Sequence, residues 1–216
     1  MAAADRSTSP LRGVAPTGVL PSAIAPVAAE AATCKRCRLA GTRTNVVFGM
    51  GSATAGLVFV GEAPGEQEDL QGLPFVGRSG QLLDRLILEE MGLTRKDFYI
   101  TNTIKCRPPG NRDPLADEIE LCSPYLEHQL AWLSPRVVVS LGNFATRLLL
   151  GTTEGITKLR GRSYPYRAGW LVPTFHPSAA LRAGGQVVAQ MRADLVRAKE
   201  ALAAGAGPLQ DEEPGR

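Results

Sequence analysis

The stretch Leu57-Val58-Phe59-Val60-Gly61-Glu62-Ala63-Pro64-Gly65-Glu66 decides how the chain folds. Its first four residues are apolar, and Gly61 closes the run. A short apolar run bounded by glycine is typical of a buried strand. The second glycine and the proline predict a tight loop whose backbone N–H groups approach a ligand closely. No Gly-Lys-Ser or Gly-Lys-Thr follows, so this is not a phosphate loop.

Strand-like and helix-like segments alternate outward from this stretch. Further strands are expected at residues 98–101, 137–141 and 171–175. One helix is expected from a Ser79 cap to Gly92, and a second from Asp113 to Trp132, with Pro114 at its first helical position. Two further helices are expected over residues 144–150 and 186–203. This order predicts an α/β fold with a mainly parallel sheet and helices on both faces. Ligands of such sheets bind at the carboxyl ends of the strands, so site residues should follow strands directly.

The two ends of the chain differ from its body. Residues 1–24 are rich in Ala, Pro, Ser and Thr and lack a helical or strand period, so we expect a disordered leader. Residues 204–216 contain Gly, Pro and an acidic cluster, and we expect a disordered tail there. Residues 25–203 are expected to form one domain, because a chain of 216 residues suffices for one full core.

Composition narrows the class of protein. Hydrophobic residues make up 44% and charged residues 21%, which is ordinary globular usage. No apolar run approaches the roughly 20 residues that span a bilayer, so we expect a soluble cytoplasmic protein without membrane contact. The net charge of +3 says little about partners. The excess of Arg over Lys suits phosphate binding, but a genome-wide composition bias explains it equally well.

All four cysteines belong to one constellation: Cys34-x2-Cys37, Cys106 and Cys122. In a reducing cytosol such cysteines are more often ligands or free thiols than disulfides. Unrelated buried thiols are the alternative to a metal site. Structural zinc sites usually pair two short knuckles, and only one is present here. All-cysteine ligation also fits a [4Fe–4S] cluster, so spacing alone leaves the metal open.

Three further residues stand where a site is expected. Asn102 ends the second strand, and its amide matches the edge of a pyrimidine unless it merely caps a turn. His176 follows the fourth strand and begins a His-Pro-Ser loop, although a core or surface histidine is the alternative. Phe75 lies in a loop, where it either stacks on a base or fills the core. His128 lies within a long amphipathic helix, and we interpret it as structural.

Six short motifs follow one another in a specific order. They are Cys-x-x-Cys, Gly-Glu-Ala-Pro-Gly-Glu, Pro-Phe-Val-Gly-Arg-Ser-Gly, Thr-Asn-x-x-Lys-Cys-Arg-Pro-Pro, Cys-x-Pro-Tyr-Leu and His-Pro-Ser-Ala-Ala-Leu. In this order they resemble the family 4 uracil-DNA glycosylases, from Cys34 to Leu195. The resemblance implies a three-layer α/β/α sandwich with a central four-stranded, mainly parallel sheet. It also implies a [4Fe–4S] cluster on Cys34, Cys37, Cys106 and Cys122.

The resemblance further implies a monofunctional DNA glycosylase that acts on single- or double-stranded DNA. The enzyme flips uracil out, hydrolyses its N-glycosidic bond, releases free uracil and leaves an abasic site for base excision repair. Phe75 stacks on the flipped ring, and Asn102 reads its Watson–Crick edge. His176 hydrogen-bonds O2 of the departing anion. The base also meets the backbone of Gly61, Glu62 and Ala63.

The residue that activates water is less clear. In better-known uracil-DNA glycosylases an Asp does so from the place that is Ala63 here. Glu62 and Glu68 are the nearby carboxylates and the catalytic candidates. DNA contacts are expected from four residues: Arg107, Arg112, Leu181 and Arg182. The leucine would fill the space that the flipped base leaves in the stack, and the arginines would hold phosphate groups.

Three rival classes of protein remain. One relative of the family 4 enzymes binds uracil-DNA covalently through a histidine in the loop after the second strand. The corresponding loop here, residues 107–113, contains no histidine, so we expect turnover without a stable protein–DNA adduct. A non-catalytic DNA-binding iron–sulfur module is disfavoured by Glu62, Phe75, Asn102 and His176. The third rival is a nucleotide-binding α/β enzyme with structural zinc. We expect a monomer in a prokaryotic cytoplasm, associated with the nucleoid.

Overall fold

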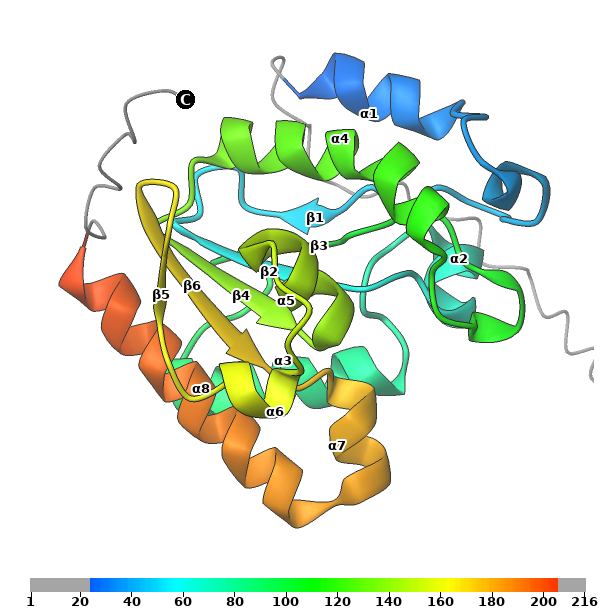
Figure 1. Cartoon of the computed structure of the whole chain (residues 1–216). Helices are drawn as coiled ribbons and strands as arrows, with labels where there is room; N and C mark the ends of the chain where they lie inside the picture. The colour runs from blue at the N-terminus through cyan, green and yellow to red at the C-terminus, as the bar shows by residue number, and fades with distance from the viewer. Residues whose placement is uncertain (1–23, 206–216) are drawn as a thin grey trace, which may run out of the picture.

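The computed structural model describes residues 24–205, and its centre is a six-stranded sheet of order β1-β3-β2-β4-β6-β5 (Figure 1). The four central strands run parallel, and the short edge strands pair antiparallel with their neighbours. The mainly parallel four-stranded sheet is therefore confirmed, and two edge strands that were not predicted extend it. The strands are β1 (Met50–Gly51), β2 (Leu57–Gly61), β3 (Tyr99–Asn102), β4 (Val137–Leu141), β5 (Tyr164–Tyr166) and β6 (Gly169–Thr174).

Helices cover both faces of the sheet, which gives the predicted three layers (Figure 1). Phe59 and Val139 are buried on the face of α3 and α8, whereas Val58 and Val138 are buried on the face of α4 and α5. All five residues of β2 are buried, as expected for a strand covered on both faces. The helices are α1 (Ala25–Ala32), α2 (Glu66–Gln71), α3 (Arg78–Met91), α4 (Ala116–Leu133), α5 (Asn143–Leu150), α6 (Ile156–Leu159), α7 (Pro177–Ala183) and α8 (Gly185–Ala204), with 3-10 turns at Arg38–Gly41 and Pro109–Asn111.

The start of α4 differs from the prediction. We expected Pro114 at the first helical position, but the helix begins at Ala116 and Leu115 caps it in an extended conformation. The cause is Glu118, whose carboxylate accepts a hydrogen bond from the backbone N–H of Leu115 at 2.9 Å. A carboxylate in the first turn satisfies a backbone donor that the helix leaves unpaired and also faces the positive end of the helix dipole.

Two other local predictions are wrong in detail. Gly77, rather than Ser79, caps α3, and its backbone N–H donates to Oε1 of Glu68 at 2.7 Å. The expected loop after β6 is instead the first turn of α7. His176 caps that helix, because its side chain accepts a hydrogen bond from the backbone N–H of Ser178. The site histidine is thus held by a helix start.

The predicted leader and tail lie outside the described residues, apart from Ile24, Ala204 and Gly205. Ile24 is buried beside the start of α1, and Ala204 is the last residue of α8. The boundaries of the single domain otherwise stay a prediction. Between residues 24 and 205, no helix has the length and apolar character needed to cross a membrane.

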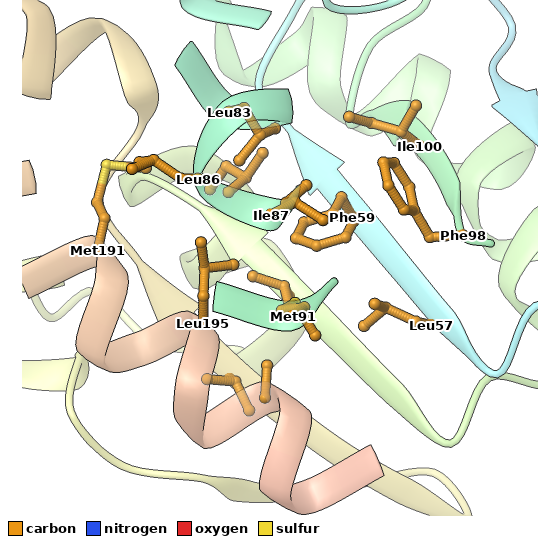
Figure 2. Packing of buried hydrophobic residues seen from close by; sticks show 14 of the residues in the cluster. Leu57, Phe59, Leu83, Leu86, Ile87, Met91, Phe98, Ile100, Met191 and Leu195 are labelled. Carbon is orange, nitrogen blue, oxygen red and sulfur yellow. The ribbon is translucent and has the colours of Figure 1, made fainter. Parts of the chain in front are cut away.

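The packing of α3 on α8 gives a test of the core. Met191 of α8 points toward Leu86 of α3, which is fully buried (Figure 2). Leu86→Ala leaves a cavity, and we expect it to lower the free energy of unfolding by about 2–5 kcal/mol. Leu88 on the same helix is 55% exposed, so Leu88→Ala should change stability by less than about 0.5 kcal/mol. Urea unfolding measures both, and equal losses would contradict this assignment of the core.

Candidate active site

The carboxyl ends of the parallel strands open into a cavity of about 540 Å³. This volume is within the range of small-molecule sites. Of the predicted site residues, eight line the cavity: Glu62, Ala63, Glu68, Phe75, Asn102, Arg112, His176 and Arg182. Gly61, Arg107 and Leu181 are not part of its lining, and neither are the four predicted metal ligands, Cys34, Cys37, Cys106 and Cys122. Most of the residues that the sequence singled out are therefore brought to one place by the fold.

The floor of the cavity depends on the absence of a side chain at Gly61. A Cβ atom at this position would lie 2.4 Å from Oδ1 of Asn102 and 2.4 Å from Cζ of Phe75. Such distances are far below van der Waals contact, so only glycine lets both side chains approach the strand end. The backbone C=O of Gly61 accepts a hydrogen bond from the N–H of Thr103 at 2.9 Å. This bond continues the pairing of β2 and β3 past the end of β3.

Phe75 is held in an unusual backbone conformation. Its φ is +54°, which is uncommon for a non-glycine residue. Arg95 donates hydrogen bonds to the carbonyl oxygens of Phe75 at 2.6 Å and Pro74 at 3.1 Å. The guanidinium of Arg95 also forms an ion pair with Asp84. The ring of Phe75 lies 5.9 Å from the ring of His176, centroid to centroid, at an angle of 37°. Arg95, which sequence reasoning missed, thus fixes the aromatic wall of the cavity.

Asn102 is almost fully buried, and its Oδ1 has no hydrogen-bond partner among the described residues. Buried polar atoms in native structures are nearly always paired, so an unpaired one at a cavity wall indicates a place for a ligand donor. The backbone C=O of the same residue accepts a hydrogen bond from Nζ of Lys105 at 2.7 Å. Lys105 was not predicted as a site residue, although it stands within the Thr-Asn-x-x-Lys-Cys motif.

His176 is set up as a neutral hydrogen-bond donor. Nδ1 accepts the backbone N–H of Ser178 at 3.2 Å and lies 2.8 Å from the hydroxyl of the same residue. With Nδ1 acting as an acceptor, the proton of the neutral ring is on Nε2. Burial, together with the nearby charge of Arg182, lowers the pKa of His176 to about 4. The imidazole is therefore uncharged at neutral pH.

The carboxylates of the cavity differ in their environments. Burial raises the pKa of Glu62 to about 7, with a further increase from Asp113 and an opposing effect of Arg182. Glu68 accepts the N–H of Gly77, as described above, so its carboxylate also shapes the loop that carries Phe75. Asp113 lines the cavity as a third acid, which sequence reasoning placed only at a helix start.

The four predicted DNA contacts have different surroundings. Leu181 and Arg182 lie on α7, where Leu181 is 43% exposed. Arg182 is exposed and makes no ion pair within residues 24–205. Arg107 donates to Oδ1 of Asn111 at 2.7 Å. Arg112 forms a bidentate pair with the buried carboxylate of Glu118, at 2.6 and 2.9 Å, so its guanidinium is already oriented by the protein.

The cysteines gather in one apolar cluster between α1 and α4. N–H groups point at two of the sulfurs: Arg43 Nη1 lies 3.4 Å from Sγ of Cys106, and the backbone N of Lys105 lies 3.3 Å from Sγ of Cys122. Such N–H···S contacts are usual around cluster thiolates. Cys34 and Cys37 complete the set.

The four cysteines of this cluster together offer an all-cysteine donor set. No group of three or more His, Cys, Asp or Glu side chains in the described part of the chain is arranged to hold one metal ion. A single zinc ion would draw four sulfurs to within about 4 Å of one another, given Zn–S bonds of about 2.3 Å. In a [4Fe–4S] cluster each thiolate binds a different iron, so the sulfurs stand farther apart. An all-cysteine donor set is compatible with a zinc ion and with a [4Fe–4S] cluster.

This fold and site define a three-layer α/β protein with a cavity of about 540 Å³ at the carboxyl ends of its strands. The model of the uracil DNA glycosylase superfamily matches residues 48–202. The chain is 48% identical over 160 residues to the type-4 uracil-DNA glycosylase of Sulfurisphaera tokodaii, covering 70% of this chain and 73% of that protein. It is 47% identical over 151 residues to the type-4 enzyme of Thermotoga maritima, covering 69% and 78%.

A more distant relative is the type-5 uracil-DNA glycosylase of Pyrobaculum aerophilum, which is 31% identical over 150 residues and is matched over 68% of this chain and 64% of that protein. The identity to the type-4 proteins is clearly higher and extends over most of the chain. The chain therefore belongs to the type-4 uracil-DNA glycosylases of this superfamily.

The contact of Gly61 with Phe75 and Asn102 leads to a prediction. Gly61→Ala should displace one of these side chains and lower kcat/KM on a uracil-containing oligonucleotide roughly 10²-fold, as for small misplacements in active sites. A Cβ atom at Gly41 would have no neighbour within 4 Å, so Gly41→Ala is the matched control and should keep its activity. Wild-type kinetics of Gly61→Ala would show that the close approach is unimportant.

Proposed function

We infer that the cavity binds a uracil flipped out of DNA and that the chain hydrolyses its N-glycosidic bond. The abasic site that remains starts base excision repair. The observation that carries this inference is the unpaired Oδ1 of Asn102, which lies beside Phe75 at the floor of the cavity. A ligand with an N–H group at that point would satisfy the oxygen.

Uracil supplies the N–H that Asn102 lacks. Its N3–H donates to Oδ1, and its O4 accepts from Nδ2 of the same amide. In cytosine N3 is an acceptor and C4 carries an amine, so both contacts would become repulsive. The ring of Phe75 stacks on the base, and the backbone of Gly61, Glu62 and Ala63 meets its edge. The cavity thereby selects uracil over the normal pyrimidine from which it arises.

The bond that breaks joins C1′ of the sugar to N1 of the base. Its electron pair leaves with uracil, and the negative charge gathers chiefly on O2. We propose that Nε2–H of His176 donates a hydrogen bond to O2, since Nδ1 is occupied by Ser178. Since the pKa of His176 is about 4, its ring is neutral at pH 7. The N–H of a neutral imidazole is too weak an acid to be transferred, so uracil departs as an anion.

A water molecule completes the reaction by adding to C1′ and losing a proton. We propose Glu62 as the acceptor of that proton, because its raised pKa makes it the stronger base. Glu68 acts by its negative charge near the sugar cation, while its carboxylate holds the Gly77 N–H. The products are an abasic sugar with a hydroxyl on C1′ and the uracil anion. The proton held by Glu62 balances this anion, which becomes free uracil on protonation.

The rim of the cavity is proposed to bind DNA. Leu181 would fill the space that the flipped base leaves, and Arg182, Arg107 and Arg112 would hold phosphates. Neither strand state is favoured by these residues, so we propose activity on single- and double-stranded DNA. We further propose that the chain works as a monomer on the prokaryotic chromosome, without a membrane partner.

We propose that Cys34, Cys37, Cys106 and Cys122 hold a [4Fe–4S] cluster. When bound, the cluster supplies four iron–thiolate bonds that tie the Cys-x-x-Cys turn to α4 and to the segment after β3. Cys106 directly precedes residues 107–113, several of which line the cavity. The cysteine residues would thus fix the base of the loop that faces DNA.

The experiment that tests the proposed function is incubation with a uracil-containing oligonucleotide, followed by alkali to break abasic sites. Cleavage at the uracil position is expected, and a cytosine-containing oligonucleotide should stay intact. Because residues 107–113 lack histidine, no protein–DNA adduct should survive boiling in denaturant. Absence of cleavage in every strand context would overturn the function, and a boiling-resistant adduct would overturn the hydrolytic mechanism.

His176→Ala removes the proposed donor to O2. We expect the single-turnover rate to fall by on the order of 10²–10³-fold, as for the loss of one such donor. The control is His128→Ala, because His128 is exposed on α4 and is not part of the cavity lining. An unchanged rate in His176→Ala would remove this residue from the mechanism.

The pH dependence of kcat/KM tests Glu62. A carboxyl group with a pKa of about 7 is protonated below that pH, so the rate should rise about tenfold per pH unit up to pH 7 and then level off. His176 is neutral throughout this range and adds no step. Glu62→Gln should remove the step and lower the plateau by roughly 10²-fold. Glu120 is exposed, so Glu120→Gln is the control, and its pH profile should match that of the wild type. If the step near pH 7 persists in Glu62→Gln, the titrating group is not Glu62.

A further inference from the structure

A buried lysine lies directly behind the residue that faces the base. Lys105 is 1% exposed, and lysines are almost never buried to this degree unless they are paired. None of the ion pairs within residues 24–205 includes it. A residue that is costly to bury and lacks a carboxylate partner needs another explanation.

The ammonium group of Lys105 is fully hydrogen-bonded. Nζ contacts Oγ1 of Thr101 at 2.7 Å, the backbone C=O of Asn102 at 2.7 Å and Oε1 of Gln129 at 2.6 Å. An ammonium has three N–H donors, and three acceptors receive them. Gln129 is itself anchored, because its Nε2 donates to the backbone C=O of Phe48 at 2.8 Å. The lysine is therefore fixed from both α4 and β3.

One of these bonds holds the peptide group that follows Asn102. The C=O of this peptide accepts from Lys105, and its N–H, which belongs to Thr103, donates to the C=O of Gly61. Both polar ends of one peptide unit are thus held, from opposite sides. Because the orientation of a peptide plane sets the direction of the adjoining Cα–Cβ bond, the two bonds together aim the side chain of Asn102.

The backbone of Lys105 reaches the cysteine cluster. Its N–H donates to Sγ of Cys122 at 3.3 Å, while its Nζ holds Asn102. A single residue therefore contacts both a predicted cluster ligand on α4 and the residue that reads the base.

We propose that Lys105 is a positioning residue: it locks the peptide after Asn102, so that Oδ1 meets N3–H of uracil, and it links this peptide to the segment that carries Cys122. This inference rests on the proposed function of the site. Lys105 is not part of the cavity lining, so in this proposal it acts through Asn102.

Lys105→Met tests the proposal, because methionine has similar length and no N–H donor. The maximal single-turnover rate on a uracil-containing oligonucleotide should fall 10- to 100-fold. The half-saturating DNA concentration should change less than about twofold, because the rim that binds DNA is untouched. Gln129→Met removes one of the three acceptors of Nζ, so it should lower the maximal single-turnover rate by a smaller factor. This variant replaces Lys105→Met in the test if Lys105→Met does not fold.

Leu86→Ala is the matched destabilised control, because it weakens the core without changing a residue of the cavity lining. Its rate should equal that of the wild type at temperatures where it is folded. All variants are compared at equal iron content by visible absorption. If Lys105 contributes only to stability, Lys105→Met and Leu86→Ala should have the same single-turnover rate. Equal rates would therefore overturn the proposal.

A double-mutant cycle shows whether Lys105 acts through Asn102. In an Asn102→Ala background, Lys105→Met should lower the rate less than about twofold, because the side chain to be aimed is gone. An undiminished 10- to 100-fold loss in that background would refute a role through Asn102.

Hydrogen exchange gives a readout that needs no activity. The amide of Thr103 should exchange at least tenfold faster in Lys105→Met than in Leu86→Ala, since its peptide is no longer held from both sides. Equal exchange would contradict the lock. Failure of the wild type to excise uracil would defeat the proposed function instead, and the exchange result would still decide whether the peptide is locked.

Discussion

The whole site depends on the pairing of β2 with β3 beyond the point where both strands end. Gly61 stands opposite Asn102 in the parallel register, and the next backbone bond, from Thr103 N–H to the Gly61 carbonyl, continues the ladder. Parallel strands end at the same edge of a sheet, so this register places the binding loop and the amide side chain together. The missing side chain at Gly61 then lets Phe75 close over the same point. A change of register would separate all three groups.

Two buried ionisable residues, Lys105 and Asp194, lie behind the cavity at the ends of β3 and β6. Lys105 lies behind Asn102, and on the other side the carboxylate of Asp194 accepts from Thr174 at 2.8 Å and pairs with Arg160. Thr174 ends β6, two residues before His176. Buried charges destabilise a protein unless every partner is in place, so each network tolerates only one local geometry. The side chains of Asn102 and His176 thus both lie next to a buried hydrogen-bond network.

The fold was predictable because its signals are local. The apolar runs of β2, β4 and β6 and the stripe of α3 follow directly from residue type. The places of Asn102 and His176 in the cavity lining were predictable because Asn102 ends a strand and His176 follows one. The roles of Arg95 and Lys105 were not, since they arise from hydrogen bonds across distant segments that no periodicity encodes. The start of α4 was misplaced for the same reason: the Glu118 carboxylate, shared with Arg112, outweighs the preference of proline for a helix start.

Burial acts in opposite directions on the two proposed catalytic groups, and this difference suits the chemistry. It raises the pKa of the Glu62 carboxyl and lowers the pKa of the His176 imidazole, because both shifts disfavour charge in the same cavity. Breaking the C1′–N1 bond creates a sugar cation and a uracil anion there. An imidazolium would be costly before the reaction, whereas a neutral Nε2–H stabilises charge only as it develops on O2. In the same way, the buried carboxylate of Glu62 is stabilised when the sugar cation forms beside it. The cavity is therefore least favourable for charge before the bond breaks, and its polar groups contribute most when the two opposite charges separate.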